Sequence, residues 1–156
     1  MALGEFQVFN EFAISIGEKL IDLENDSIKM ALIDDTVTPT AADATPMWAA
    51  GSDVDYDGNE VSGTNYSAGG TALTAPALTL GAAVATFDDG TDLVWSQSGT
   101  GFSTARWGIL YSDTSTAKNA IGFLDLGGDV GNVAGDLTIA FHTNGILTIT
   151  VSDTIA

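Results

Sequence analysis

The sequence predicts a mainly β (α+β) fold, in which an N-terminal amphipathic helix is followed by a β-sandwich or a closed antiparallel sheet of about eight strands. Two observations predict this fold. Apolar residues recur every three or four positions near the N-terminus, and short segments of alternating polarity, separated by Gly, Asp, Ser or Asn, fill most of the remaining chain. The chain has 156 residues and no cysteine, so we expect a single domain over residues 1–156 that is stabilised by packing alone.

The helix is expected within residues 1–25. Its apolar stripe consists of Phe6, Phe9, Ala13, Ile16, Leu20 and Leu23. Spacings of three or four are typical of one helix face, and Phe12 widens this face. The stripe is too short for a free coiled coil, so we expect it to pack on a sheet or on a partner.

Residues 26–34 are expected to form the first strand, with Ile28, Met30 and Leu32 on one side. Residues 35–65 are rich in Asp, Thr, Ala and Gly and show little periodicity. They are interpreted as a long acidic loop excursion on the surface, and long loops of this kind are usually binding or regulatory segments.

Residues 66–156 are expected to form a β-domain. Its predicted strands are residues 71–80, 83–88, 92–97, 105–112, 119–126, 135–142 and 145–152. We expect the last two strands to form a hairpin with a three-residue loop at 143–145, which pairs Phe141 with Leu147 and Ile139 with Ile149. Gly145 would supply a positive φ at a bulge.

The charge of the chain limits its partners. Four basic residues oppose 21 acidic ones, which gives a formal net charge of −17. Phosphate backbones and anionic lipids would be repelled, so we expect no nucleic acid and no membrane as partner. No run of apolar residues is long enough for a membrane-spanning helix, and the N-terminus lacks the features of a secretory signal.

The sequence offers little for catalysis. His142 is the only histidine, and it follows a predicted strand out of phase with the apolar residues, so we expect it to be solvated. A zinc site or a Ser-His-Asp relay needs more histidine or cysteine than one chain provides. No Walker A, G-x-G-x-x-G or G-x-S-x-G motif is present. The chain is therefore expected not to be an enzyme.

One acidic segment resembles half of a calcium loop. Asp53, Asp55 and Asp57 alternate and precede Gly58, as in the first half of an EF-hand loop. The twelfth position, which should supply a bidentate carboxylate, is Thr64. The three carboxylates are therefore candidate calcium ligands, with a solvated acidic loop as the alternative interpretation.

The tryptophans could form a stacking platform for sugars or nucleic acid strands. Trp107 alternates with Ile109 and Tyr111, which favours a core or interface position. Trp48 lies in the irregular excursion and is the one tryptophan expected to make an exposed contact.

Several short motifs, in this order, are similar to those of capsid decoration (cement) proteins of tailed phages. The motifs are SIKMALIDD at 27–35, EVSGTNYSAGG at 60–70, ARWGILYSDT at 105–114, AIGFLDLGG at 120–128 and NGILTI at 144–149. The resemblance covers most of the chain. The acidic insert around residues 39–58 departs from the family pattern.

The resemblance implies a structural virion protein on the capsid exterior that binds the major capsid protein and stabilises the shell. It also favours self-association into trimers or similar clusters, because a lattice offers the same site many times. The sequence leaves two alternatives open. One is a phage tail or baseplate protein, and the other is a host- or carbohydrate-binding module that uses Trp48 and the acidic loop.

Overall fold

The computed structural model describes residues 4–49, 51 and 53–152. Over these residues the protein is mainly β, as predicted, with ten strands in antiparallel sheets and very little helix. The elements are β1 (Phe6–Val8), α1 (Phe12–Gly17), β2 (Ile28–Ile33), η1 (Asp57–Asn59), β3 (Thr71–Ala72), β4 (Pro76–Gly81), β5 (Val84–Asp89), β6 (Leu93–Trp95), β7 (Ala105–Ser112), β8 (Ala120–Val130), β9 (Leu137–Ile139) and β10 (Leu147–Thr150).

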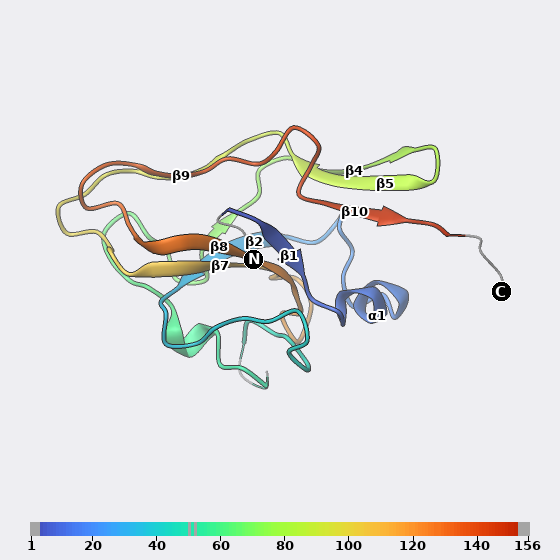
Figure 1. Cartoon of the computed structure of the whole chain (residues 1–156), viewed down its shortest axis with the longest axis horizontal. Coiled ribbons are helices and arrows are strands. Elements are labelled where there is room, and N and C mark those ends of the chain that lie inside the picture. The colour runs from blue at the N-terminus through green and yellow to red at the C-terminus, as the bar shows by residue number, and fades with distance from the viewer. Residues whose placement is uncertain (1–3, 50, 52, 153–156) are drawn as a thin grey trace.

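The strands form three antiparallel sheets, with the orders β1-β8-β7-β2-β3, β10-β5-β4 and β6-β9. Figure 1 shows the five-stranded sheet in the middle of the molecule, with β9 and the three-stranded sheet above it and the segment between β2 and β3 below it. The described residues form no closed sheet, so that alternative is wrong. The β-sandwich stays a prediction.

The central sheet is buried on both faces, as β2 illustrates. Ile28, Met30 and Leu32 pack into one hydrophobic cluster, on the side that their alternation predicts. Ala31 and Ile33 point the other way, into a second cluster. The other buried members of the second cluster are Phe9, Trp48, Tyr56, Trp107, Ile109, Tyr111, Ala120 and Phe123.

The segment of residues 35–65 covers the second face of the sheet. It is irregular, as predicted, but it is not simply a surface excursion, because it places buried side chains on the core. Its backbone is fixed to β8 and the turn before it: the Trp48 N–H donates to the Lys118 carbonyl and the Ala120 N–H donates to the Pro46 carbonyl, both at 2.8 Å. Buried loop backbone needs such partners.

The motif EVSGTNYSAGG forms a loop that is stabilised by hydrogen bonds between its own residues. The Glu60 carboxylate accepts hydrogen bonds from the Tyr66 hydroxyl at 2.8 Å and from the Gly69 N–H at 2.6 Å. Gly70 has a φ of +78°, and a Cβ there would lie 2.0 Å from the Met30 carbonyl oxygen. Only glycine fits this contact between the loop and β2.

The predicted N-terminal helix is mostly wrong. Residues 6–8 form β1, which pairs with β8 so that Phe6 lies opposite Leu124 and Val8 lies opposite Gly122. The segment alternates as FQVF, which a strand can also use, and pairing with the long β8 outweighs the helical spacing.

The helix that does form, α1, ends early because the chain reverses at Lys19. Lys19 has a φ of 59°, and its N–H donates to the Ile16 carbonyl at 3.2 Å. The Leu20 N–H donates to the Ser15 carbonyl at 2.8 Å. This pair of bonds is a Schellman motif, which closes the helix. No helix in the described part of the chain is long and apolar enough to cross a membrane.

The last two strands do not form the predicted hairpin with each other. β9 pairs with β6, where Ile139 lies opposite Leu93, and β10 pairs with β5, where Leu147 lies opposite Phe87. The residues between β9 and β10 carry the chain from one sheet to another. Gly145 has the expected positive φ, at +92°.

The remaining strands follow the predicted ones closely. β7 coincides with the predicted strand over residues 105–112. The predicted strand at 71–80 is divided into β3 and β4, because the Asp89 carboxylate accepts the N–H groups of Thr74 and Ala75 at 3.2 and 2.8 Å. These bonds replace ladder bonds and start β4 in a separate sheet.

Candidate functional site

We refer to the three-stranded sheet of β4, β5 and β10 as the arm. The arm has one mainly apolar and one mainly polar face. Its register places Leu78 and Leu147 on either side of Phe87. Because side chains alternate along each strand, the apolar face carries Leu78, Leu80, Ala85, Phe87, Leu147, Ile149 and Val151. The opposite face carries Thr79, Thr86, Thr148 and Thr150.

The apolar face of the arm runs from the core into solvent. Phe87 and Leu147 are buried in the first hydrophobic cluster. Toward the tip, the exposed fractions of Leu80 and Val151 rise to 76% and 71%. Figure 1 shows the β4–β5 hairpin and the chain after β10 reaching away from the central sheet. The apolar face of the arm therefore packs into the core at one end and is exposed to solvent at the other.

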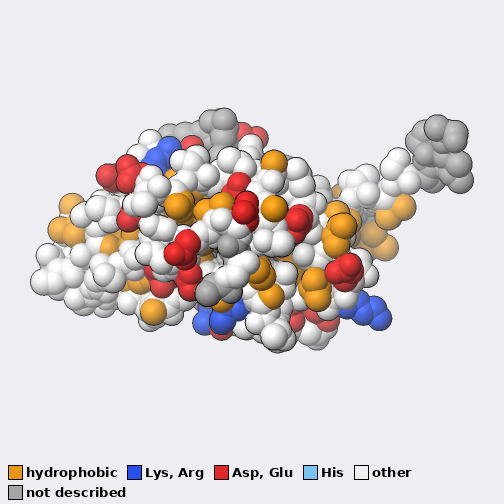
Figure 2. Space-filling model, turned by 90° about the horizontal axis from the view of Figure 1, so that it is seen from below, with side chains coloured by type: hydrophobic (Ala, Val, Ile, Leu, Met, Phe, Trp, Pro, Cys, Tyr) orange, Lys and Arg blue, Asp and Glu red, His pale blue; other side chains and the backbone are white. Residues whose placement is uncertain are grey.

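A groove of about 580 Å³ separates the arm from α1 and the segment that follows it. Its lining residues are Ile16, Lys19, Ile21, Asp22, Leu23, Leu78 and Ile149. Two exposed side chains, Ile14 and Leu20, belong to the helical side. We call the groove, together with Ile14, Leu20, Leu80 and Val151, the apolar end. Figure 2 shows hydrophobic side chains at this end of the molecule.

The helical side of the apolar end is acidic. Residues 18–26 contain Glu18, Asp22, Glu24 and Asp26 but only one cation, Lys19. The pKa of Asp22 lies below its ordinary value because the Asn25 side chain and nearby backbone N–H groups donate to its carboxylate. This rim therefore stays negative at neutral pH. The arrangement suits an apolar partner surface that is bordered by cations.

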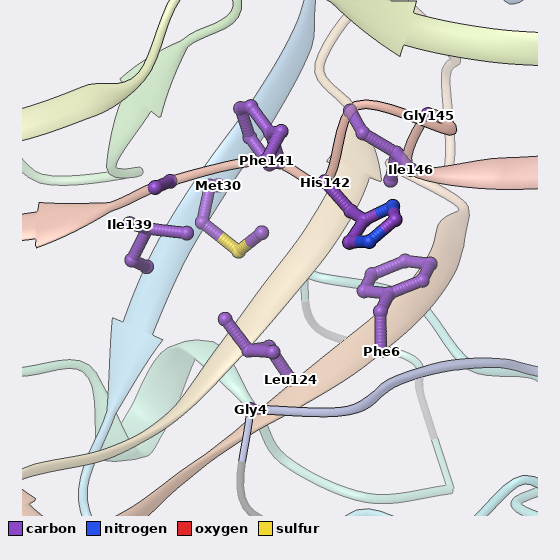
Figure 3. Close-up of a pocket in the computed structure, with 10 residues that line it drawn as sticks. Gly4, Phe6, Met30, Leu124, Ile139, Phe141, His142, Gly145 and Ile146 are labelled. Carbon is purple, nitrogen blue, oxygen red and sulfur yellow. The ribbon is translucent and has the colours of Figure 1, made fainter.

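A second hollow, of about 460 Å³, lies between the central sheet and the chain that links β9 to β10. In Figure 3, Phe6 of β1, Met30 of β2 and Leu124 of β8 face Ile139 and Phe141 across it. Among the described residues its lining is apolar except for one ionisable side chain, His142. The hollow could hold an apolar group, but the described part of its lining has no carboxylate or amine that would perform chemistry with the imidazole.

His142 is exposed, as predicted. Its Nδ1 accepts the Asn144 N–H at 3.1 Å, so the neutral ring carries its proton on Nε2. This bond shapes the turn before β10. The histidine therefore has a local structural contact, and no side chain in the described part of the chain forms the hydrogen bond with it that a general base needs.

The predicted calcium ligands lie on an exposed loop that ends in η1. Asp55 turns back on the loop, where its Oδ1 accepts the Gly58 N–H at 3.0 Å. A Cβ at Gly58 would lie 2.4 Å from the other carboxylate oxygen, so a larger residue there would require the exposed Asp55 side chain to move. Asp53 and Asp57 are exposed. Among the described residues, no three His, Cys, Asp or Glu side chains converge to hold a metal ion. Calcium binding stays a prediction.

The carboxyl group of Asp57 has a shifted pKa. Its pKa is raised, first by desolvation and then by the hydrogen bond and the like charge of Asp55. The loop also contacts the rest of the excursion, since the Tyr56 hydroxyl donates to Asp43 at 2.6 Å. The pKa of Tyr56 is raised, mainly by burial. The hydrogen bond to Asp43 therefore fixes the loop to the rest of the excursion.

The expectation that Trp48 makes an exposed contact is wrong. Its ring is buried and stacks on Tyr111, with ring centroids 5.2 Å apart and an interplanar angle of 16°. Trp107 is buried, as predicted, against Phe123. Trp95 is buried as well. None of these rings is available as a stacking platform, so the host- or carbohydrate-binding alternative loses Trp48 and keeps only the acidic loop.

Three of the four basic side chains form ion pairs with carboxylates of the same chain. Lys29 contacts Asp113 at 2.8 Å, and Lys118 contacts the same carboxylate. The pKa of Asp113 is therefore lowered, first by Lys118 and then by Lys29. Arg106 pairs with Asp125 and lowers its pKa. Lys19, at the apolar end, forms no ion pair with any described residue.

A buried asparagine that the sequence analysis missed connects three segments. The Asn132 Oδ1 accepts the Phe102 N–H at 2.9 Å, and its Nδ2 donates to the carbonyls of Thr64 and Ser96 at 3.1 and 2.8 Å. Nothing in the sequence distinguishes Asn132 from other turn asparagines, since the segments that it joins are far apart along the chain.

Comparisons with protein-family models, with curated proteins and with solved structures gave no match to this chain.

Proposed function

We propose that this chain is a structural protein that docks on a larger protein assembly. More specifically, we propose that it decorates and stabilises the capsid exterior of a tailed phage by binding the major capsid protein, without enzymatic activity. The motifs that resemble decoration proteins support this proposal, because ARWGILYSDT and AIGFLDLGG supply β7 and β8, the two longest strands. The resemblance therefore concerns the framework of the fold.

The observation that carries the proposal is the apolar end. Covering a large apolar side chain contributes about 1.5–3 kcal/mol. The exposed side chains Ile14, Leu20, Leu80 and Val151 therefore represent several kcal/mol that only a partner can supply. Association costs a comparable amount, so a single contact of this size is weak. Many equivalent sites on a lattice, and clustering around a symmetry axis, would make weak contacts effective.

The charge of the chain supports a protein partner with cations. The net charge of −17 disfavours packaged DNA and anionic lipids. The acidic residues beside the groove favour Lys or Arg around an apolar contact. Binding should then weaken as the salt concentration rises, since exposed charges are screened.

The test is binding to shells assembled from the major capsid protein of the same phage. Purified wild-type protein should co-sediment with these shells, and Leu20→Asp should bind at least about tenfold less, because it places a charge in the contact. The matched control is Val94→Asp on β6. Val94 is as exposed as Leu20, at 49% against 45%, but lies outside the apolar end.

Virion analysis separates the remaining alternatives. A decoration protein should be present in a number close to the number of capsomers and should remain with the heads when tails are removed. Absence of wild-type binding, or equal binding of Leu20→Asp and wild type, would refute the assignment of the apolar end. Recovery with tails alone would favour a tail or baseplate protein.

A further inference from the structure

The outer edge of β4 has backbone groups without a hydrogen-bond partner among the described residues. β4 is the edge strand of the arm, and a two-residue loop at Ala82 and Ala83 joins it to β5. In a two-residue hairpin the flanking residues, here Gly81 and Val84, exchange hydrogen bonds. Every second residue of β4 then faces β5, and the N–H and C=O groups of the residues between them face outward.

The outward residues of β4 are Leu78 and Leu80. The opposite ladder supports this phase, because the Val151 N–H donates to the Ala83 carbonyl and Ile146 donates to the Phe87 carbonyl, so odd-numbered residues of β5 face β10. Phe87 and Ala85 of β5 lie opposite Leu78 and Leu80 of β4. Because Phe87 and Ala85 use their backbone groups toward β10, Leu78 and Leu80 form no ladder bonds with β5.

This edge has none of the usual protection against pairing with another strand. Natural edge strands commonly carry charges, bulges or central prolines. β4 is regularly paired along its whole length, and its one proline, Pro76, is at the first position. No charged residue occurs between Thr71 and Phe87. The nearest charges are Asp88 and Asp89, at the base of the hairpin opposite Ala77 and Pro76, so in a chain with a net charge of −17 the residues around Thr79 can approach another copy without a charge at the contact itself.

We propose that β4 pairs antiparallel with β4 of a second copy, about a two-fold axis through Thr79, which joins the two arms into one continuous sheet. In this register Leu78 lies opposite Leu80 of the other copy, and the two residues exchange N–H···O bonds. Thr79 lies opposite Thr79 of the other copy, in a pair without hydrogen bonds.

Two features favour this register. It uses both N–H groups of the edge, whereas a shift that brings Pro76 opposite Leu80 puts a residue without an N–H into a hydrogen-bonding position. It also covers Leu80, the most exposed of the large hydrophobic side chains in the described chain, with a leucine. A two-fold axis perpendicular to the sheet keeps both apolar faces on the same side.

This pairing can be tested without the proposed function, because it is a property of the isolated chain. The two proposals share Leu80, whereas Ile14, Leu20 and Val151 of the apolar end take no part in the strand pairing. A two-fold contact makes a dimer, so on a lattice it would link neighbouring clusters and would not build a cluster by itself. The dimer can form whether or not the protein binds capsids, and a failure of either proposal leaves the other intact.

Single-cysteine variants test the register. The chain has no cysteine, so each variant has one thiol. At a pair without hydrogen bonds the Cα atoms lie about 4.5 Å apart, which permits a disulfide. Thr79→Cys should therefore form a covalent dimer under mild oxidation. The matched control is Ala77→Cys, on the same face of β4, whose Cα would lie about 14 Å from its counterpart. Thr79→Cys should give at least about tenfold more covalent dimer.

Charge variants test the contact without a covalent bond. In sedimentation velocity the wild type should be a dimer, and Thr79→Lys and Thr79→Glu should each be monomers, since like charges would face each other. An equimolar mixture of the two variants should restore the dimer. Thr148→Lys, at the opposite edge of the arm and on the same face, should leave the dimer unchanged. A monomeric wild type, or equal crosslinking of the two cysteine variants, would overturn the proposal.

Discussion

Replacement of Asn132 by alanine should be among the most destabilising single changes in this chain. Its side chain makes three hydrogen bonds to backbone groups of three segments that are far apart along the chain, at Thr64, Ser96 and Phe102. A net contribution of about 1 kcal/mol for each bond, plus the cost of leaving buried backbone groups without partners, predicts a loss of about 3–5 kcal/mol. For a chain of this size the loss corresponds to a fall in Tm of roughly 6–20 °C.

Urea unfolding followed by tryptophan fluorescence would measure this loss, with the slope of the transition checked for a change in the unfolded state. Asn144→Ala is the control, because Asn144 is an exposed turn asparagine and should change stability by less than about 0.5 kcal/mol. Asn132→Asp has nearly the same shape and keeps the acceptor for Phe102, but it turns a carboxylate toward two carbonyls. It should therefore be more destabilising at neutral pH than in acid. A loss below about 1 kcal/mol for Asn132→Ala would refute the reasoning.

Three further predictions follow from contacts in the fold. Gly70→Ala should destabilise the protein by at least about 2 kcal/mol, because its Cβ would overlap the Met30 carbonyl at a positive φ, and thermal unfolding would measure this loss. Acid should destabilise the protein through Asp113: its pKa is lowered from 3.8, so the stability from its contacts with Lys29 and Lys118 is present above this value and is lost as the pH falls below it. Asp113→Asn should flatten that part of the pH profile, and an unchanged slope would contradict the assignment. Millimolar calcium should leave the Tm unchanged, and a rise that disappears in the triple Asn variant would instead establish a site at Asp53, Asp55 and Asp57.

The strands were predictable where alternation and burial act together. β2 and β7 have side chains that divide cleanly between two hydrophobic clusters, and both strands lie where the sequence predicts them. Their positions depend on local pattern, which a single sequence contains. Strand pairing depends on the whole chain. Leu137–Ile139 and Leu147–Thr150 are adjacent, alternating and separated by a turn, yet each pairs with a strand about 45–65 residues earlier.

The N-terminal segment illustrates a pattern with two solutions. Apolar residues at spacings of three and four fit a helix, but Phe6 and Val8 also fit a strand of period two. The strand forms because residues 6–8 pair with the edge of β8. The helix that follows stays short because the chain reverses at Lys19. A lysine with positive φ gives no signal in the sequence, because glycine is the usual residue at that position.

The candidate site was predictable only in part. Trp48 and the acidic loop were expected to be exposed because their segment lacks periodicity. The structure places Trp48 against Tyr111, since one face of a sheet with apolar residues on both sides needs a cover, and residues 35–65 are the available chain. Irregular backbone therefore did not mean a solvated segment. The apolar end could not be predicted, because it combines α1 with strands from the other half of the chain.

The distribution of charge connects the core with the proposed role. Arg106, Lys29 and Lys118 are all paired with carboxylates on or beside β7 and β8, where they neutralise acids close to the central sheet. Most of the other acidic side chains remain exposed, so the body of the protein is strongly negative and should resist self-association through most of its surface. The arm is different, because residues 71–87 carry no charge, Asp88 and Asp89 lie only at the base of its hairpin, and one of its faces is apolar. Charge repulsion over the acidic body and apolar attraction at the apolar end therefore act together. Both direct contact with another protein to the apolar end of the molecule.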